Sequence, residues 1–383
     1  MKVALVHDWL TGMRGGERCL EVFCEIFPGA DLFTLVHQRG AVSPTIERAS
    51  IHTSWLQSLP LSTAYYRHLL PLFPLAIRQF QLAGYDLVLS SSHAVAKGVR
   101  RDGSSMHVCY CFTPMRYIWD QSQVYFPRDR FSPVSWALLQ ALFRYLRTWD
   151  INTARGVDEF VAISDHIARK IRAYYNREAH VIPPPVDCGF FTPDSSPQPY
   201  GASFYLIVSA LVPYKRVDIA VEAFNRLHLP LVVIGVGPER PKLERSASSS
   251  ITFLGWQPDA VVREYYRRCE ALIFPGEEDF GIVPVEAQAC GKPVIAFGKG
   301  GALETVIPLN GAAPDDTPYR SPTGVFFYET AVDALCDAVS LCRRHMTAFD
   351  PAAIRQNALR FDRPAFKARI ATFLADKMGM AIA

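Results

Sequence analysis

The sequence lacks the features that would place it across a membrane, outside the cell or on nucleic acid. It has no run close to the roughly 20 apolar residues that a membrane-spanning helix needs. Charges stand too early in residues 1–8 for a signal peptide, so we expect a cytoplasmic protein that opens on a β-strand. A net charge of +3 over 383 residues gives no reason to expect a nucleic-acid partner.

Cysteine shows no organised pattern either. The nine cysteines are an odd number and are scattered without the spacing of a metal site. Cys109 and Cys111 would lie on one face of a buried strand, too close together for a tetrahedral pair. We therefore expect reduced, buried thiols and no bound metal.

What the chain does have is enough apolar sequence for two domains. Its 383 residues are 49% hydrophobic and 20% charged, as in ordinary soluble proteins with a substantial core. Short apolar strands alternate with helices in both halves, which predicts an α/β fold of two doubly wound, Rossmann-like domains. We assign residues 1–192 to an N-terminal domain, 193–201 to a linker, 202–363 to a C-terminal domain, and 364–383 to a helix that packs back on the N-terminal domain.

Four loops of the second half follow the C-terminal ends of expected strands. They are residues 210–216, 235–238, 255–256 and 276–284. In a doubly wound domain such loops share one edge of the sheet, so residues far apart in the sequence converge there. We expect the ligand at this edge, in a cleft between the two domains.

These loops carry groups suited to a nucleoside diphosphate. Lys215 and Arg216 supply positive charge for a diphosphate leaving group. Gly235 and Gly237 permit a close approach of the backbone, and Trp256 offers a flat face to a base. Each feature is weak alone, but their order along one edge predicts a nucleoside diphosphate with a further group attached.

The most informative stretch runs from Glu277 to Phe297, EEDFGIVPVEAQACGKPVIAF. Glu278 lies before a helix that we expect over residues 285–290, with Pro284 in its first turn. The free backbone amides where that helix begins suit a phosphate. Glu286, inside the helix, can accept two hydrogen bonds from vicinal hydroxyls such as those of a ribose.

The first half has a glycine turn between a strand and a helix. A strand over residues 3–6 leads through Gly15 and Gly16 into a helix over residues 19–27. This order brings backbone amides to a phosphate, although a plain tight turn explains the two glycines equally well.

Polar side chains also follow strand ends in the first half. Asp8, Arg116, Tyr117 and Asp120 are therefore acceptor-side candidates. The alternatives are that Asp8 holds its own turn and that residues 116–120 make a loop-to-helix salt bridge.

An unusual stretch over residues 55–80 interleaves aromatic and basic side chains. Its members are Trp55, Tyr65, Tyr66, Arg67, His68, Phe73, Arg78 and Phe80. Such a surface suits peripheral docking on anionic lipid headgroups. The alternative is that the aromatic residues pack between helices and that the arginines are solvated.

Together these motifs resemble glycosyltransferase family 4. The residues that carry the resemblance are Gly15–Glu17, Pro114–Asp120, Pro184–Asp187, Leu211–Asp218, Glu278–Ile295 and Gly300–Val306. The family has the GT-B fold, in which two Rossmann-like domains face each other across a cleft. Within the family, the chain is most similar to bacterial mannosyltransferases that build O-antigen and related surface polysaccharides.

The resemblance implies retaining transfer of a sugar from a nucleotide-sugar to an acceptor hydroxyl, with no metal or other cofactor. The N-terminal domain is then the acceptor side and the C-terminal domain the nucleotide-sugar-binding side. In such enzymes the leaving phosphate is thought to take the acceptor proton, so no protein base is required.

The resemblance also implies a role for each matched residue. Glu286 matches the acid that binds the ribose, and Lys215 matches the lysine that neutralises the diphosphate. The Gly15–Gly16 loop closes on that phosphate. The donor sugar is held by Glu278 and by the amides of Phe280, Gly281 and Ile282.

Two positions depart from the family pattern. Ala210 stands where the family commonly has an arginine, and Arg216 covers part of that loss. Phe112 stands where the family usually has a histidine that contributes to donor-sugar binding. Our hypothesis is that Phe112 packs against a 6-deoxyhexose or pentose; the alternative is that it fills space and that the donor is GDP-mannose.

Three further expectations concern rival functions and partners. A sugar-nucleotide 2-epimerase of the same fold and a non-catalytic sugar-nucleotide-binding protein remain alternatives to the transferase. The acceptor is expected to be a lipid-linked sugar or an oligosaccharide. The enzyme would then contact the anionic inner face of the plasma membrane from the cytoplasm.

Overall fold

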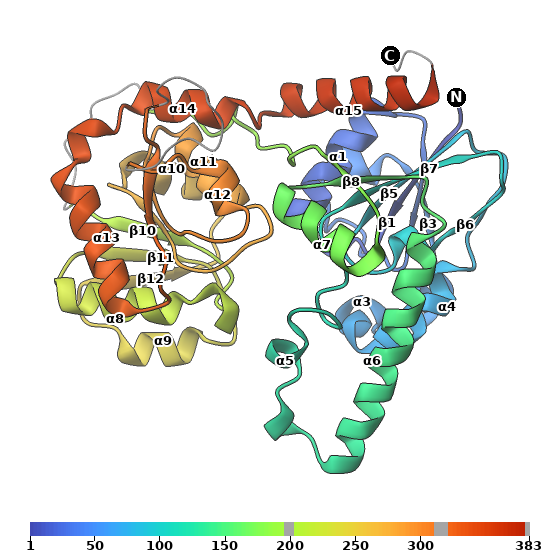
Figure 1. The fold of residues 1–383 in the computed structure, drawn as a ribbon, viewed down its shortest axis with the longest axis horizontal. Coiled ribbons are helices and arrows are strands. Elements are labelled where there is room, and N and C mark those ends of the chain that lie inside the picture. The colour runs from blue at the N-terminus through green and yellow to red at the C-terminus, as the bar shows by residue number, and fades with distance from the viewer. Residues whose placement is uncertain (195–202, 310–320, 380–383) are drawn as a thin grey trace. The chain divides into compact units, whose positions relative to one another are not determined.

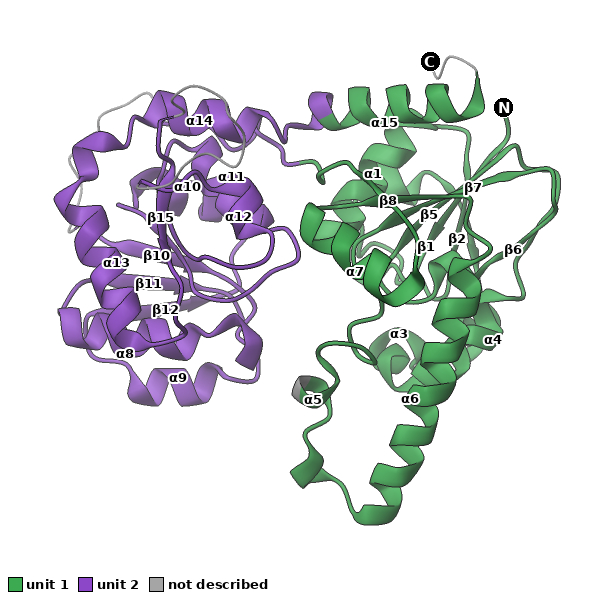
Figure 2. Ribbon diagram, in the orientation of Figure 1, with its two compact units in different colours: residues 1–185, 366–383 green, residues 186–365 purple. Residues whose placement is uncertain are grey.

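The computed structural model describes residues 1–194, 203–309 and 321–379, and it divides into two compact units (Figure 1 and Figure 2). The first unit comprises Met1–Pro185 with Phe366–Ala383, and the second comprises Val186–Ala365. Residues 186–192, which we assigned to the N-terminal domain, thus group with the second unit: the Cys188 amide donates to the Asp362 carboxylate (3.1 Å). Most of the expected linker lies outside the described residues.

The first unit is built on a seven-stranded parallel sheet in the order β3-β2-β1-β5-β7-β8-β9. Its strands are β1 (Val3–His7), β2 (Asp31–Thr34), β3 (Ser50–Thr53), β5 (Leu87–Ser92), β7 (Met106–Cys111), β8 (Glu159–Ala162) and β9 (His180–Val181). A separate parallel pair is formed by β4 (Gln81–Leu82) and β6 (Arg100–Arg101).

The helices of the first unit vary widely in length. They are α1 (Gly15–Ile26), α2 (Pro44–Glu47), α3 (Ser62–Tyr65), α4 (Phe73–Ile77), α5 (Ser122–Tyr125), α6 (Pro133–Ala154) and α7 (Asp165–Tyr175), with 3-10 turns at Trp55–Ser58, Tyr66–Leu72, Ala96–Gly98 and Arg128–Arg130. Helix α4 ends at Ile77, and β4 begins at Gln81.

The last helix, α15 (Arg363–Met378), packs on the first unit. The ring of Phe366 lies 5.6 Å from that of Phe23 and 5.7 Å from that of Tyr110. Lys377 pairs with Glu159 (2.9 Å). Aromatic burial therefore ties the end of the chain to the sheet of the first unit.

The second unit is built on a six-stranded parallel sheet in the order β12-β11-β10-β13-β14-β15. Its strands are β10 (Tyr205–Val208), β11 (Leu231–Ile234), β12 (Ile251–Gly255), β13 (Leu272–Phe274), β14 (Val294–Phe297) and β15 (Gly324–Phe327). Its helices are α8 (Val217–Leu227), α9 (Arg240–Ser246), α10 (Asp259–Arg268), α11 (Ile282–Ala289), α12 (Ala302–Thr305), α13 (Val332–Arg344) and α14 (Pro351–Leu359), with 3-10 turns at Pro213–Lys215 and Met346–Ala348.

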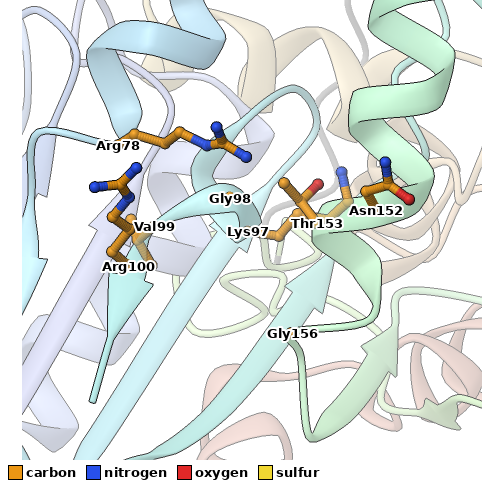
Figure 3. Close-up of a pocket in the computed structure, with 8 residues that line it drawn as sticks. All are labelled: Arg78, Lys97, Gly98, Val99, Arg100, Asn152, Thr153 and Gly156. Atoms are coloured by element: carbon orange, nitrogen blue, oxygen red, sulfur yellow. The ribbon is translucent and has the colours of Figure 1, made fainter. Parts of the chain in front are cut away.

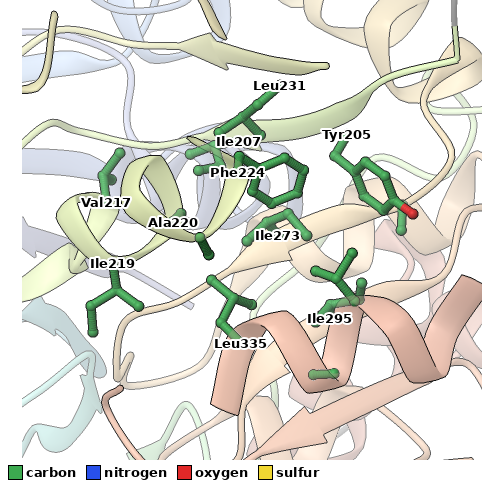
Figure 4. Close-up of a cluster of buried hydrophobic side chains, with 14 of the residues drawn as sticks. Tyr205, Ile207, Val217, Ile219, Ala220, Phe224, Leu231, Ile273, Ile295 and Leu335 are labelled. Atoms are coloured by element: carbon green, nitrogen blue, oxygen red, sulfur yellow. The ribbon is translucent and has the colours of Figure 1, made fainter. Parts of the chain in front are cut away.

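Burial explains why these sequences form these elements. All four side chains of β14 are buried, as expected of a parallel strand covered on both faces. The core between the sheet and α8 and α13 includes Phe224, Ile273 and Leu335 (Figure 4). The expected alternation of strands and helices is confirmed in both units.

Two further expectations concern thiols and membrane spans. All nine cysteines are free thiols, and all but Cys336 are buried. Within the described ranges, no helix combines the length and the apolar character that crossing a bilayer would take.

Candidate functional site

The four predicted loops of the second unit leave neighbouring strands at one edge of the sheet. They follow β10, β11, β12 and β13, which are adjacent in the order β12-β11-β10-β13, and all are parallel. The convergence predicted from the sequence is therefore confirmed for the loops. The following contacts show which residues of these loops meet.

Gly235 and Gly237 bring two loops together. A Cβ on Gly235 would lie 1.8 Å from the Ser209 carbonyl oxygen, and one on Gly237 would lie 2.2 Å from that of Leu211. The Leu211 amide donates to the Val236 carbonyl (2.9 Å). The glycines are needed for a close backbone approach, as we expected, but the approach in the structure is between the β10 and β11 loops.

Lys215 and Glu278 come from different loops and form an ion pair. Both side chains are mostly buried, with exposures of 18% and 15%. The backbone of Gly276 lies so close that a Cβ there would stand 2.8 Å from the Lys215 Cα. One cation and one carboxylate predicted to serve the same ligand thus share a position at the sheet edge.

Glu286 lies in the second turn of α11 and is only 8% exposed. The Tyr266 hydroxyl, on α10, donates a hydrogen bond to its Oε2 (2.9 Å). Burial and the neighbouring Glu286 hold the pKa of Tyr266 well above its usual value, so the phenol keeps its proton. The sequence does not identify Tyr266 as a partner of Glu286, because helical spacing does not distinguish a core tyrosine from one that orients a carboxylate.

The start of α11 is set by glycines. Gly281 adopts a left-handed conformation (φ 95°) at the N-cap, so α11 begins at Ile282, three residues earlier than we predicted. The Gly301 amide donates to the Glu278 carbonyl (2.8 Å), and a Cβ on Gly301 would lie 2.2 Å from the Phe280 Cα. The Phe280 side chain is 3% exposed and packs on Phe361, so its backbone rather than its ring is the group at the helix start.

The remaining two candidates of the second unit, Trp256 and Arg216, have more exposed side chains. Trp256 is 72% exposed directly after β12. The Arg216 guanidinium pairs with Asp218 (3.2 and 3.3 Å), and Ala210 is exposed in the same loop. Arg216 therefore lies beside Lys215 in sequence but is engaged by its own helix.

In the first unit, Asp8 is fully buried and holds a turn. Its carboxylate accepts hydrogen bonds from the amides of His93, Ala94, Val95 and Ala96 (2.7–3.0 Å). The His93 ring nitrogen Nδ1 lies 3.0 Å away. Burial alone would raise the pKa of Asp8, but the charge and hydrogen bonds of His93 outweigh it and lower that pKa. Asp8 therefore holds the turn over residues 93–96 that follows β5, and not its own turn as in the alternative that we gave.

Gly16 and Phe112 meet at His7. A Cβ on Gly16 would lie 3.4 Å from both rings, and the Phe112 and His7 rings are 6.3 Å apart. His7 is fully buried, and its Nδ1 lies 2.7 Å from Ser91 Oγ. Burial lowers the pKa of His7 to about 4, so the imidazole is neutral at pH 7. Phe112 thus packs edge-on against an uncharged ring.

The candidates after β7 contact other side chains of the first unit. Asp120 pairs with Lys170 of α7 (2.6 Å), which is the loop-to-helix salt bridge that we gave as the alternative. The Tyr117 ring packs on Tyr125, and burial raises the pKa of Tyr117. Arg116 is partly buried in the same loop.

The aromatic and basic stretch over residues 55–80 is divided between core and surface. Tyr66, Phe73 and Phe80 are buried in the main hydrophobic cluster of the first unit, whereas Trp55 and Tyr65 are 37% and 57% exposed. The packing alternative therefore accounts for three of the five aromatic residues.

One pocket of the first unit, of about 230 Å³, contains none of the donor-side or acceptor-side candidates (Figure 3). Arg78 and Arg100 line it together with residues 97–99, 152–153 and 156. Lys97 within it is paired with the buried Asp150. Among the residues that the structure describes, no group of three or more His, Cys, Asp or Glu side chains is placed to hold a metal ion.

Comparison with known proteins connects the second unit to glycosyl transfer. Residues 192–342 match the family model of glycosyl transferases group 1. An uncharacterized glycosyltransferase of Methanocaldococcus jannaschii is 39% identical over 27% of this chain and 31% of its own. A D-inositol 3-phosphate glycosyltransferase of Geodermatophilus obscurus is 28% identical over 53% of this chain and 57% of its own. Mannosyltransferases are also among the relatives.

The fold comparison covers the whole chain. HepE of Anabaena, solved in complex with UDP, superposes with a TM-score of 0.70 and 17% identity over 98% of this chain and 100% of its own. By contrast, this chain matches only 31% and 57% of the length of the two curated relatives above. Residues 192–342 are therefore similar to the glycosyl transferases group 1, in a chain with the two-domain α/β fold known as GT-B.

Proposed function

We propose that the protein is a retaining glycosyltransferase of family 4, which moves a sugar from a nucleotide-sugar to an acceptor hydroxyl without a metal ion. The observation that supports this most is the pairing of Lys215 with Glu278 at the sheet edge, inside the region that matches group 1 glycosyl transferases. An ammonium held beside a carboxylate is available to move to a diphosphate as negative charge grows on it.

Three side chains of the second unit have specific roles in this proposal. Lys215 stabilises the leaving diphosphate, and Glu278 holds a donor-sugar hydroxyl once the ion pair opens. Glu286 binds the ribose, since the Tyr266 hydrogen bond fixes its carboxylate (2.9 Å). The backbone amides at the start of α11 stabilise the negative charge of the diphosphate, because a helix N-terminus favours an anion.

The donor sugar depends on Phe112 in this proposal. Its neighbours include Gly16 and the rings of Tyr110, His7 and His93, and the phenyl ring itself presents an apolar edge where the family has a polar side chain. A donor without a 6-hydroxyl, such as a 6-deoxyhexose or a pentose, fits that edge. GDP-mannose remains the second candidate, since mannosyltransferases are among the relatives.

The acceptor is proposed to be a lipid-linked sugar or an oligosaccharide in polysaccharide or glycolipid biosynthesis. One relative is named a phosphatidylinositol monomannoside mannosyltransferase, which acts on a lipid. We place the enzyme in the cytoplasm at the anionic inner face of the plasma membrane.

A donor panel tests the activity. GDP-mannose, GDP-fucose, dTDP-rhamnose and UDP-xylose are incubated with the protein and a lipid-linked acceptor extract, in the presence and absence of a chelator. We expect release of nucleoside diphosphate from one donor, unchanged by the chelator, and a product of unchanged anomeric configuration. Clear preference for GDP-mannose would overturn the 6-deoxy proposal, and an isomerised donor without acceptor would reveal an epimerase.

The variant Lys215→Met tests the site itself. Loss of one transition-state donor typically costs about 100-fold in turnover, which we expect here. Lys242→Met is the matched control, since Lys242 lies on α9 with its side chain 72% exposed. Equal turnover by the two variants would contradict the proposed role of Lys215.

A further inference from the structure

Helix α6 has two apolar faces, and only one of them is buried. Phe143, Leu146 and Trp149 are buried against the first unit. On the face away from Phe143, Val134 is 71% exposed, Leu138 67% and Tyr145 54%. Figure 2 shows the N-terminal half of α6 reaching beyond the sheet of its unit. A helix that is apolar on both faces is expected to have both covered.

The exposed residues form one continuous stripe. Val134, Leu138, Ala141 and Tyr145 are spaced by four, three and four residues, and all four are exposed. This spacing places them in line along one side of the helix. At 1.5 Å per residue the stripe is about 17 Å long, so it suits contact along a surface and is too short to cross a bilayer.

Positive charge flanks the stripe. Arg128 and Arg130 stand in the turn before α6, and Arg144 lies on the helix beside the stripe; all three are exposed. Asp129 is the only acid between residues 122 and 148. An apolar stripe edged by arginine is the pattern of a helix that lies in the headgroup region of an anionic membrane.

We propose that this surface docks the first unit on an anionic lipid bilayer; the α6 surface is defined as Arg128, Arg130, Val134, Leu138, Ala141, Arg144 and Tyr145. The charge pattern favours a bilayer over a second copy of the chain. Pairing two copies would gather their arginines with Asp129 as the only local acid to offset them, whereas anionic headgroups offset every arginine.

The proposal specifies which surface contacts the membrane. It rests on the proposed function in one respect, because docking on a bilayer would bring the enzyme to a lipid-linked acceptor. It also replaces the stretch over residues 55–80 as the main docking surface, since three aromatic residues of that stretch are core. Docking itself needs no sugar nucleotide, so it is measured independently of transfer.

Vesicle co-sedimentation of the full chain tests the surface. The probes are vesicles of phosphatidylcholine alone and of phosphatidylcholine with phosphatidylglycerol. We expect binding to the anionic vesicles only, weakened by salt because the arginines are solvent-exposed. The double variant Val134→Ser/Leu138→Ser should bind about tenfold more weakly, because it removes most of the apolar area of the stripe.

Three further measurements make the result decisive. Thermal unfolding should be unchanged in the double variant, since both side chains are exposed, and Arg144→Gln should lower the preference for anionic vesicles. Leu75→Ser, at a 65% exposed position of the stretch over residues 55–80, should bind like the parent. Loss of binding in Leu75→Ser but not in the double variant would overturn the proposal, as would a dimer in light scattering that the double variant dissolves while vesicle binding stays unchanged.

Discussion

The two units carry similar sheets but use the polar residues at their strand ends differently. In the second unit, Lys215 pairs with Glu278 across two loops, and Tyr266 of α10 donates a hydrogen bond to Glu286 of α11. In the first unit, Asp8 accepts hydrogen bonds from amides of the turn over residues 93–96, which follows β5, and Asp120 pairs with Lys170 of α7. The polar side chains of the first unit are thus engaged by a turn and a helix of that unit, whereas those of the second unit pair with one another at the sheet edge.

The largest expected effect concerns glycines. Gly301→Ala would force a Cβ to 2.2 Å from the Phe280 Cα, whereas Gly16→Ala meets only side-chain atoms at 3.4 Å. We expect Gly301→Ala to lower the free energy of unfolding by about 3 kcal/mol, because the clash is with backbone. Gly16→Ala should change it by less than about 1 kcal/mol.

Denaturant titration measures both variants, with Gly29→Ala as a control because no atom lies within 4 Å of its added Cβ. Equal destabilisation by Gly301→Ala and Gly16→Ala would contradict the contrast between the two units, in which the loops at the sheet edge of the second unit are packed more tightly than those of the first.

A smaller effect concerns pH. Burial lowers the pKa of His7 to about 4, with Asp8 opposing and His93 assisting this shift. The unfolded histidine binds a proton near pH 6.5 and the folded one does not, so stability falls as pH drops from 7 towards 4. Between pH 7 and pH 5, His7 should account for a loss of about 2 kcal/mol.

His7→Gln should remove that part of the dependence. His107, whose pKa burial also lowers to about 4, contributes with the same sign and keeps a similar part in the variant. Unfolding curves at several pH values provide the measurement. An unchanged pH slope in His7→Gln would mean that His7 is protonated in the folded state, and thus available to a ligand.

The smallest effect concerns the salt bridge of the first unit. Asp120→Asn removes a partly exposed pair with Lys170 and should cost less than about 1 kcal/mol of stability. Turnover with the donor identified by the panel should stay within about twofold of the parent, since the loss is structural. A tenfold fall in acceptor affinity at unchanged stability would restore Asp120 to the acceptor site and weaken the comparison.

The sequence was most informative where local rules act. Pro and Gly positions and the alternation of apolar strands with helices predicted the four loops that follow β10, β11, β12 and β13 of the second unit. The roles of Tyr266 and Asp8 could not be predicted, because each depends on partners 20 and 85 or more positions away. Helix α11 was placed late because a left-handed Gly281 was not anticipated.

The close glycine contacts also decide how this edge can change. Gly235 and Gly237 interlock the β10 and β11 loops, and Gly300 and Gly301 interlock the β13 loop with the start of α12. Loops in such contact cannot be exchanged singly, because a graft that shifts one backbone removes the space that its neighbour requires. New donor specificity would be reached by changing side chains on an inherited backbone, and engineering should transfer the whole edge as one block.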